Sequence, residues 1–145
     1  MMARGKDDRP VELYGFTRRV MTGCGKLYCT TNYKDGKPHE IQALLGRAGG
    51  CAAAFCQGLG CLASAALEYG MPIERIIKQL ESVSCHASNH VEGDLKLFCC
   101  PDGIADALKA ASEITICPKC GSHCKENGKC INPDCNWKMK KPKEE

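Results

Sequence analysis

Four cysteines near the C-terminal end form two closely spaced pairs, and this spacing constrains the fold more than any other feature does. The pairs are Cys117 with Cys120, and Cys130 with Cys135. Thiolates two residues apart on a turn bind one side of a tetrahedral ion, and a second pair about ten residues further on completes the site. Few apolar residues lie between residues 117 and 137, so metal binding and folding become one event. The sequence therefore predicts a zinc ribbon in which these four thiolates bind Zn²⁺.

Other interpretations of this segment stay open. His123 and Cys124 are spare potential ligands, and Cys124 is able to replace one of the four cysteines. The alternative to a zinc ribbon is a disordered tail with free cysteines. A ribbon followed by Trp137 and a lysine-rich tail also suits contact with nucleic acid, through base stacking and phosphate binding. The net charge of +3 is too small to indicate nucleic-acid binding by itself.

Thirteen cysteines in 145 residues is a high and odd number, which raises the question of compartment. Residues 1–9 are charged and do not resemble a signal peptide. No stretch approaches the ~20 apolar residues that span a bilayer. A disulfide framework has no supporting context, so we expect reduced thiols, a cytoplasmic location and no membrane partner.

The chain before the cysteine pairs has the pattern of an α+β domain. Strands are expected at residues 13–21, 27–33 and 39–45, with Asp35-Gly36 as a hairpin turn and a further short strand at Leu95–Phe98. Helical spacing predicts helices at residues 50–69, from Pro72 to Leu80, and from Cys100 to Ala111. The predicted fold is a small antiparallel sheet packed by about three helices. Residues 1–113 form this domain, 114–137 the ribbon and 138–145 a charged tail.

The stretch that joins the last hairpin strand to the first helix is rich in glycine. Ile41, Ala43 and Leu45 are expected on one face of the strand, with Glu40 and Gln42 on the other. The turn that follows contains Arg47, Gly49 and Gly50, and it leads into a helix N-terminus whose free N–H groups favour anions. Arg47 adds a forked cation. We expect a phosphate or nucleotide site here, with Asn89 as a polar contact. The alternative is a tight turn in which glycine supplies only a positive φ.

The remaining cysteines are expected to act mostly as small buried hydrophobes. Four of them fall at turns or at the starts of elements, which leaves a second metal site or a redox pair as an alternative. These are Cys24, Cys51, Cys85 and Cys100. The helix at residues 50–69 has a face of small residues, which favours packing on the sheet or on a second copy, so we expect a homo-oligomer.

The sequence contains few candidate catalytic residues. Cys85 is adjacent to His86, but neighbours in sequence do not establish a catalytic geometry. The sequence has no nucleophile elbow and no phosphate-binding loop of the Walker type. We expect no catalysis by this chain alone.

Four motifs, in order, resemble the TSCPD domain, which lies near the C-terminus of adenosylcobalamin-dependent (class II) ribonucleotide reductases. The motifs are Gly23-Cys24-Gly25-Lys26-Leu27-Tyr28, Gly46-Arg47-Ala48-Gly49-Gly50-Cys51, Ile76-Ile77-Lys78-Gln79-Leu80 and Cys100-Pro101-Asp102-Gly103-Ile104-Ala105. The resemblance extends over about residues 10–135. In two respects the sequence departs from the pattern: Phe98-Cys99 stands where the family has Thr-Ser, and no cysteine follows Cys135.

The resemblance implies an accessory module, because the catalytic barrel of the reductase is absent. We therefore expect a non-catalytic module that binds a nucleotide-like phosphate ligand or docks on a reductase subunit in deoxyribonucleotide synthesis. One alternative is a phage-type sponge that sequesters cyclic nucleotide or cyclic ADP-ribose immune signals. A ribbon that binds nucleic acid is the other.

Overall fold

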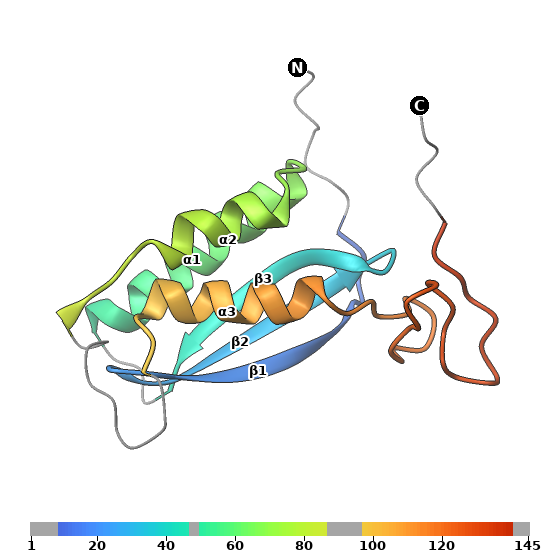
Figure 1. Cartoon of the computed structure of the whole chain (residues 1–145), viewed down its shortest axis with the longest axis horizontal. Coiled ribbons are helices and arrows are strands. Elements are labelled where there is room, and N and C mark those ends of the chain that lie inside the picture. The colour runs from blue at the N-terminus through green and yellow to red at the C-terminus, as the bar shows by residue number, and fades with distance from the viewer. Residues whose placement is uncertain (1–8, 47–49, 87–96, 141–145) are drawn as a thin grey trace.

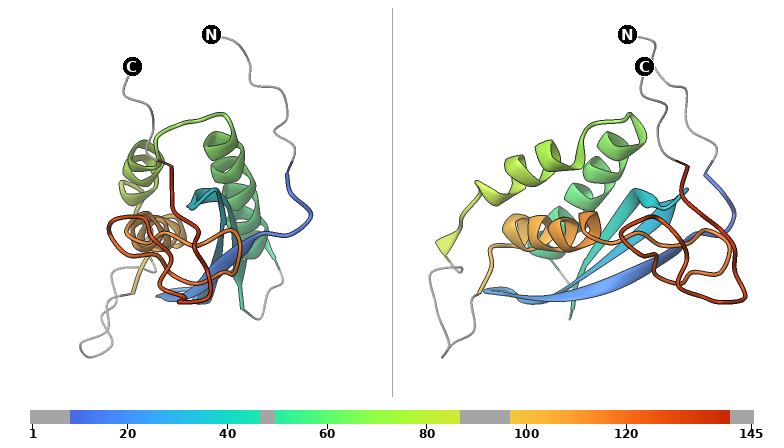
Figure 2. Two further views of the ribbon diagram at one scale, coloured as in Figure 1. Left: turned by 90° about the vertical axis from the view of Figure 1, so that its right-hand side faces the viewer. Right: turned by 45° about the vertical axis from the view of Figure 1, so that its right-hand side comes forward.

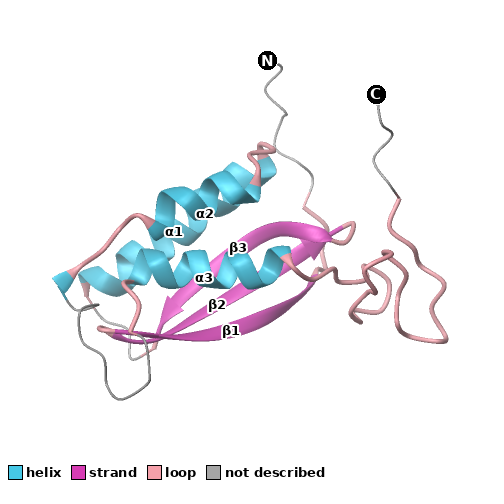
Figure 3. Cartoon of the chain, viewed as in Figure 1, coloured by secondary structure: helices cyan, strands magenta, loops and turns pink. Residues whose placement is uncertain are grey.

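The computed structural model describes residues 9–46, 50–86 and 97–140. Three strands form an antiparallel meander in the order β1-β2-β3; two of the three helices pack on this sheet, and the third packs on the other helices (Figure 1). The strands are β1 (Tyr14–Thr22), β2 (Gly25–Lys34) and β3 (Lys37–Leu45). The helices are α1 (Cys51–Glu68), α2 (Ile73–Glu81) and α3 (Cys100–Ser112). Figure 3 shows that the described segment after α3, which ends at residue 140, contains neither a helix nor a strand. The α+β fold predicted from the sequence is confirmed.

The sheet is built from two tight hairpins. The β2–β3 hairpin turns at Asp35 and Gly36, both with positive φ, as the Asp-Gly pair predicts. The predicted alternation in β3 is confirmed at Ile41, Ala43 and Leu45, which are buried.

Glu40 departs from the expected pattern. It was expected on the opposite face of the strand from the buried residues, but it is buried too. Its carboxylate accepts two hydrogen bonds of 2.8 Å from Arg9 and one of 2.7 Å from Asn32. These partners, one of them 31 residues away, compensate the cost of removing the carboxylate from water. They also hold the pKa of Glu40 below its usual value, chiefly through the hydrogen bond with Arg9.

Helix α1 lies along β3, which is an edge strand. The Ser64 hydroxyl is 2.9 Å from both the N–H and the carbonyl oxygen of Ile41, so it satisfies backbone groups that point away from β2. Gly60 allows the close approach, because a Cβ there would lie 3.2 Å from the Ala43 nitrogen. The face of α1 that packs on the domain is therefore made of small residues, as expected. Helix α1 protects the edge of the sheet from pairing with another strand.

The main core lies between the sheet, α1 and α3, and α2 packs on α3 (Figures 1 and 2). Helix α3 contributes the apolar side predicted from its spacing, with Ile104, Ala105, Leu108 and Ala111 all fully buried. In α2, Ile76 and Ile77 are buried. The short strand expected at Leu95–Phe98 is seen only at Phe98, which bridges to Thr22 in parallel; residues 95 and 96 lie outside the described residues.

Candidate metal centre and adjoining cleft

The segment after α3 forms two cysteine-bearing turns held by backbone hydrogen bonds. In the first turn, the Gly121 N–H donates to the Cys117 carbonyl at 2.9 Å, and Gly121 takes the positive φ of 72° that closes it. In the second, the Cys135 N–H donates to the Asn132 carbonyl at 3.1 Å. A bridge between Cys124 and Cys130 joins the two halves. Local backbone geometry therefore presents both pairs of thiols on neighbouring turns.

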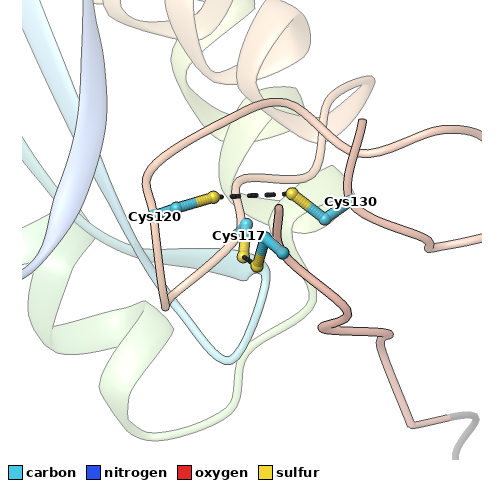
Figure 4. A group of neighbouring side chains, drawn as sticks. Cys117, Cys120 and Cys130 are labelled. Carbon is cyan, nitrogen blue, oxygen red and sulfur yellow. Dashed lines mark hydrogen bonds between the residues drawn. The ribbon is translucent and has the colours of Figure 1, made fainter. Parts of the chain in front are cut away.

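These turns bring together the four cysteines predicted from their spacing. The sulfur atoms of Cys117, Cys120, Cys130 and Cys135 all lie within 4.8 Å of one another. The Cys120 and Cys130 sulfurs are 3.5 Å apart (Figure 4), and those of Cys117 and Cys135 are 3.7 Å apart. A tetrahedral ion with metal–sulfur bonds of ~2.3 Å requires sulfurs about 3.8 Å apart. The cluster is compatible with a zinc ribbon, and its donor set fits a metal ion of tetrahedral preference.

The two cysteines drawn face to face in Figure 4 differ in their readiness to lose a proton. Hydrogen bonds from the side chain and backbone of Ser122 lower the pKa of the Cys120 thiol to about 6. Burial raises the pKa of Cys130 to about 12. Thiolate is the form that binds metal, so Cys120 is the ligand that is already poised for it.

The two spare ligands have backbone roles. His123 pairs with Ile116, and its carbonyl accepts a hydrogen bond of 3.1 Å from Ile131. The Cys124 N–H donates to the Thr115 carbonyl at 2.9 Å, and burial raises the pKa of its thiol. Among the described residues, neither side chain belongs to the four-sulfur cluster.

The ribbon packs on the far end of the β-sheet. A Cβ on Gly36, at the hairpin turn, would lie 2.8 Å from the Trp137 ring and 3.0 Å from Thr115. A Cβ on Gly121 would lie 2.5 Å from the ring of Tyr14 in β1. Two glycines at tight turns therefore make room for aromatic rings, one ring from the ribbon and one from the domain.

A cleft of about 770 Å³ opens where the ribbon meets the hairpin. Its charged lining is cationic except for Asp35, and it includes four lysines: Lys34, Lys37, Lys138 and Lys140. Trp137 lines the same cleft and is half-buried. His39 also lines it, is 7% exposed, and has a buried Nε2 atom with no hydrogen-bond partner among the described residues. The arrangement offers positive charge, an aromatic surface and an unsatisfied imidazole nitrogen.

Sequence reasoning missed this cleft. Its lysines come in two groups about 100 residues apart in the chain, one beside the hairpin turn and one after the last cysteine. The sequence indicated that Trp137 and the lysines after it suit base stacking and phosphate binding, but it did not connect them with Lys34 and Lys37 at the hairpin. Their juxtaposition depends on how the ribbon packs, which spacing alone does not indicate.

The predicted anion site falls largely outside the described residues. Arg47 and Gly49 lie outside them, and so does Asn89. Gly50 is exposed and precedes α1 with a positive φ of 90°. Within residues 9–46, 50–86 and 97–140 no side chain caps this end of the helix, and its first turn contains no acidic residue.

The cysteines of the α+β domain gather at the opposite end of the sheet from the ribbon. The Cys100 sulfur, at the start of α3, is 3.9 Å from the Thr22 hydroxyl, which also accepts a hydrogen bond of 3.2 Å from the Cys24 N–H. Burial, and after it the neighbouring Cys100 thiol, raises the pKa values of the Cys24 and Cys56 thiols, so these side chains lie near one another. Of the four cysteines considered for a second site, Cys24 and Cys100 therefore meet, with Cys56 beside them. Burial, and after it the neighbouring Cys85 thiol, raises the pKa of Cys99 to about 12, and Cys51 is exposed at the start of α1.

These domain thiols are difficult to ionise. Burial raises the pKa values of Cys29 and Cys56 to about 12, and that of Cys24 is also raised. At neutral pH they are protonated and behave as small apolar groups.

Fold and site together define a small α+β module that carries a cysteine cluster of the zinc-ribbon type. The family model of the TSCPD domain matches residues 3–112, so the chain belongs to the TSCPD domain family. The TSCPD domain is a module associated with ribonucleotide reductases. No curated protein and no solved structure matches the chain.

Proposed function

We propose that this chain is a non-catalytic module of the ribonucleotide reductase system that binds a nucleotide-like, phosphate-bearing ligand. The cationic cleft between ribbon and hairpin is the observation that supports this proposal most. Its lysine ammonium groups attract phosphate, and the Trp137 ring offers a surface for a base. The His39 Nε2 atom is able to donate to, or accept from, a ligand group once its tautomer adapts.

The ribbon contributes by holding a Zn²⁺ ion on Cys117, Cys120, Cys130 and Cys135. The bound ion fixes the turns, and the turns place Trp137 and Lys138 against the hairpin. In this proposal zinc has no catalytic step, because all four of its positions are thiolates.

The glycine-rich turn remains a second candidate for the phosphate contact. Its supporting observation is the uncapped N-terminus of α1 after Gly50, which favours an anion. Arg47, Gly49 and Asn89 would supply the remaining contacts. Arg47→Ala tests this turn separately from the cleft.

Equilibrium dialysis against labelled nucleoside diphosphates and triphosphates tests the proposal. The double variant Lys37→Ala/Lys138→Ala is expected to weaken binding ~10-fold or more, since two charge-assisted contacts are lost. The matched control is Lys119→Ala, an exposed lysine of the same ribbon that does not line the cleft. Equal losses in both variants would indicate a general charge effect and contradict the cleft. A loss only in Arg47→Ala would move the site to the turn.

Two further measurements separate the related functions. Co-purification with a barrel-containing reductase subunit is expected if the module docks on the reductase. Retention of unmodified cyclic nucleotides in native mass spectrometry would support the sponge instead. Binding to single strands that weakens steeply with salt and needs the ribbon would support a nucleic-acid binder.

A further inference from the structure

The outward side of α1 carries large apolar side chains that no other described part of the chain covers. Phe55 is 72% exposed, Leu62 is 69% exposed and Tyr69, directly after the helix, is 65% exposed. They follow one another at intervals of seven residues. Each is preceded by a small residue four positions earlier, and these small residues are also seven apart: Cys51, Gly58 and Ala65. Large and small residues therefore alternate along one stripe with the spacing of a heptad seam.

The two glycines in the middle of α1 show that packing within one chain explains Gly60 but does not explain Gly58, which lies in the stripe. Gly60 faces β3, where a Cβ would meet the Ala43 backbone. Gly58 faces the other way, and a Cβ there would meet no atom of the described residues within 4 Å. Glycine is a poor helix former, so it needs a reason to occupy the middle of an 18-residue helix. Close approach of another backbone from outside would supply that reason.

The order of large and small residues fits a second copy of the same helix in antiparallel orientation. When two copies run in opposite directions about a two-fold axis near residue 60, Phe55 faces Ala65 of the other copy. Gly58 then faces Leu62, and Cys51 faces Tyr69, so every large side chain meets a small one. A parallel pair would place large residues against large ones.

We propose that the outward stripe of α1 is a homodimer interface, in which two copies of α1 pack antiparallel and each supplies both the large and the small residues. The interface is isologous, as a two-fold dimer requires. Residues 51–67 carry no charge, so no like charges oppose the approach of two copies.

The available area suits a dimer of modest affinity. Large aromatic side chains bury roughly 150–250 Å² each, so two that are about 70% exposed, together with Leu62 and the small residues beside them, give two copies roughly 800–1,000 Å² in total. That is the lower end for a specific interface. Helix α1 is also long and apolar enough, by length and composition alone, to cross a membrane. It has no lysine or arginine for the polar face typical of helices that lie on a bilayer surface, so a second copy is the better occupant.

Sedimentation equilibrium of the zinc-loaded chain between about 5 and 200 µM tests the proposal, with a monomer–dimer equilibrium expected in this range. Leu62→Glu is expected to weaken the dimer at least ~30-fold, because it places two charges in an apolar seam. Gly58→Leu is expected to do the same by filling the space that receives Leu62, while the open space around Gly58 leaves the monomer fold intact. The matched control is Gln57→Glu, which adds a charge at an exposed position of α1 off the stripe.

The antiparallel orientation of the two α1 helices is tested by introducing one additional cysteine. In the antiparallel dimer, Tyr69→Cys is expected to form a disulfide with Cys51 of the other copy when oxidised glutathione accepts the electrons. Within one chain these positions are about 27 Å apart, so the link identifies the dimer. A chain that stays monomeric at 200 µM would overturn the proposal, as would dimers unaffected by both stripe variants. A Cys51–Cys51 link would overturn the antiparallel orientation, and vesicle binding abolished by Leu62→Glu in a monomeric chain would assign the stripe to a membrane.

Discussion

The cysteines of this chain form two groups that differ in their backbone setting, in how closely their sulfur atoms cluster and in their pKa values. The ribbon group lies on turns, and its four sulfurs are all within 4.8 Å of one another. The domain group, centred on Cys100, lies where the β1–β2 turn, α1 and α3 meet inside an apolar core. Burial raises the pKa values of the Cys29 and Cys56 thiols in the domain, whereas hydrogen bonds from Ser122 lower that of Cys120 in the ribbon to about 6.

The difference teaches that the donors and neighbouring thiols around a cysteine decide what it does. At Cys120, the backbone and hydroxyl donors of Ser122 stabilise the thiolate, which is the form that binds metal, whereas burial raises the pKa of Cys130, which a metal ion must therefore deprotonate on binding. On a helix or strand, the backbone donors are already used, and burial favours the neutral thiol. We therefore expect the ribbon to depend on a metal and the domain to depend on its apolar core.

The largest expected effect comes from removing the metal. Cys117→Ser, or a strong chelator, is expected to reduce zinc from one ion per chain to near zero and to unfold the ribbon, since structural zinc contributes ~10–16 kcal/mol to such sites. Amide NMR spectra are expected to lose dispersion only for residues after α3. A collapse of the α+β domain in the same experiment would contradict the contrast between the two regions.

A smaller effect is expected where the ribbon packs on the hairpin. Trp137→Ala removes the ring that covers Gly36 and is expected to cost about 2–3 kcal/mol, less than a fully buried tryptophan would. Zinc content is expected to stay at one per chain, because Trp137 is not a ligand. Loss of zinc together with the ring would show that packing and ligation are not separable here.

Two cysteines in α1, one buried and one exposed, form a matched pair that measures how much the burial of a thiol contributes to the free energy of unfolding. Cys56→Ser places a hydroxyl in the core and is expected to lower the free energy of unfolding by about 1–2 kcal/mol. Cys61→Ser, at an exposed position of the same helix, is expected to change it by less than about 0.5 kcal/mol. Chemical denaturation of both variants makes the comparison, and equal effects would argue against a purely apolar role for Cys56.

The smallest effect is expected in alkali. The pKa values of Cys29 and Cys56 rise to about 12 in the folded state, from an ordinary value near 9. Stability from these buried neutral thiols is fully present well below pH 9 and is lost as the pH rises towards 12, by about 0.4 kcal/mol per thiol at pH 9. Chemical denaturation of the zinc-loaded chain at a series of pH values measures this loss of stability. A Cys29→Ala/Cys56→Ala variant whose stability falls as steeply in alkali would contradict this origin.

Local signals predicted the parts of this molecule that depend on neighbours in sequence. The Asp35-Gly36 turn, the alternation of Ile41, Ala43 and Leu45, and the two cysteine pairs each follow from residues a few positions apart. The burial of Glu40 was not predictable in this way, because it depends on Arg9, 31 residues away.

The same reasoning explains why the cleft and the α1 stripe were missed. The small residues of α1 were expected to pack closely, but only the position of β3 decides that Gly60 faces inward and Gly58 outward. Likewise, the lysines at residues 34 and 138 form one surface only because the ribbon folds back on the hairpin.

The most direct test is to measure nucleotide affinity by equilibrium dialysis for the same chain with and without zinc. If the ribbon completes the ligand site, removing zinc is expected to weaken binding at least ~10-fold, and adding zinc back is expected to restore it. Equal affinity in both forms, with the ribbon unfolded in one of them, would contradict the central claim that a metal-organised ribbon builds the cleft.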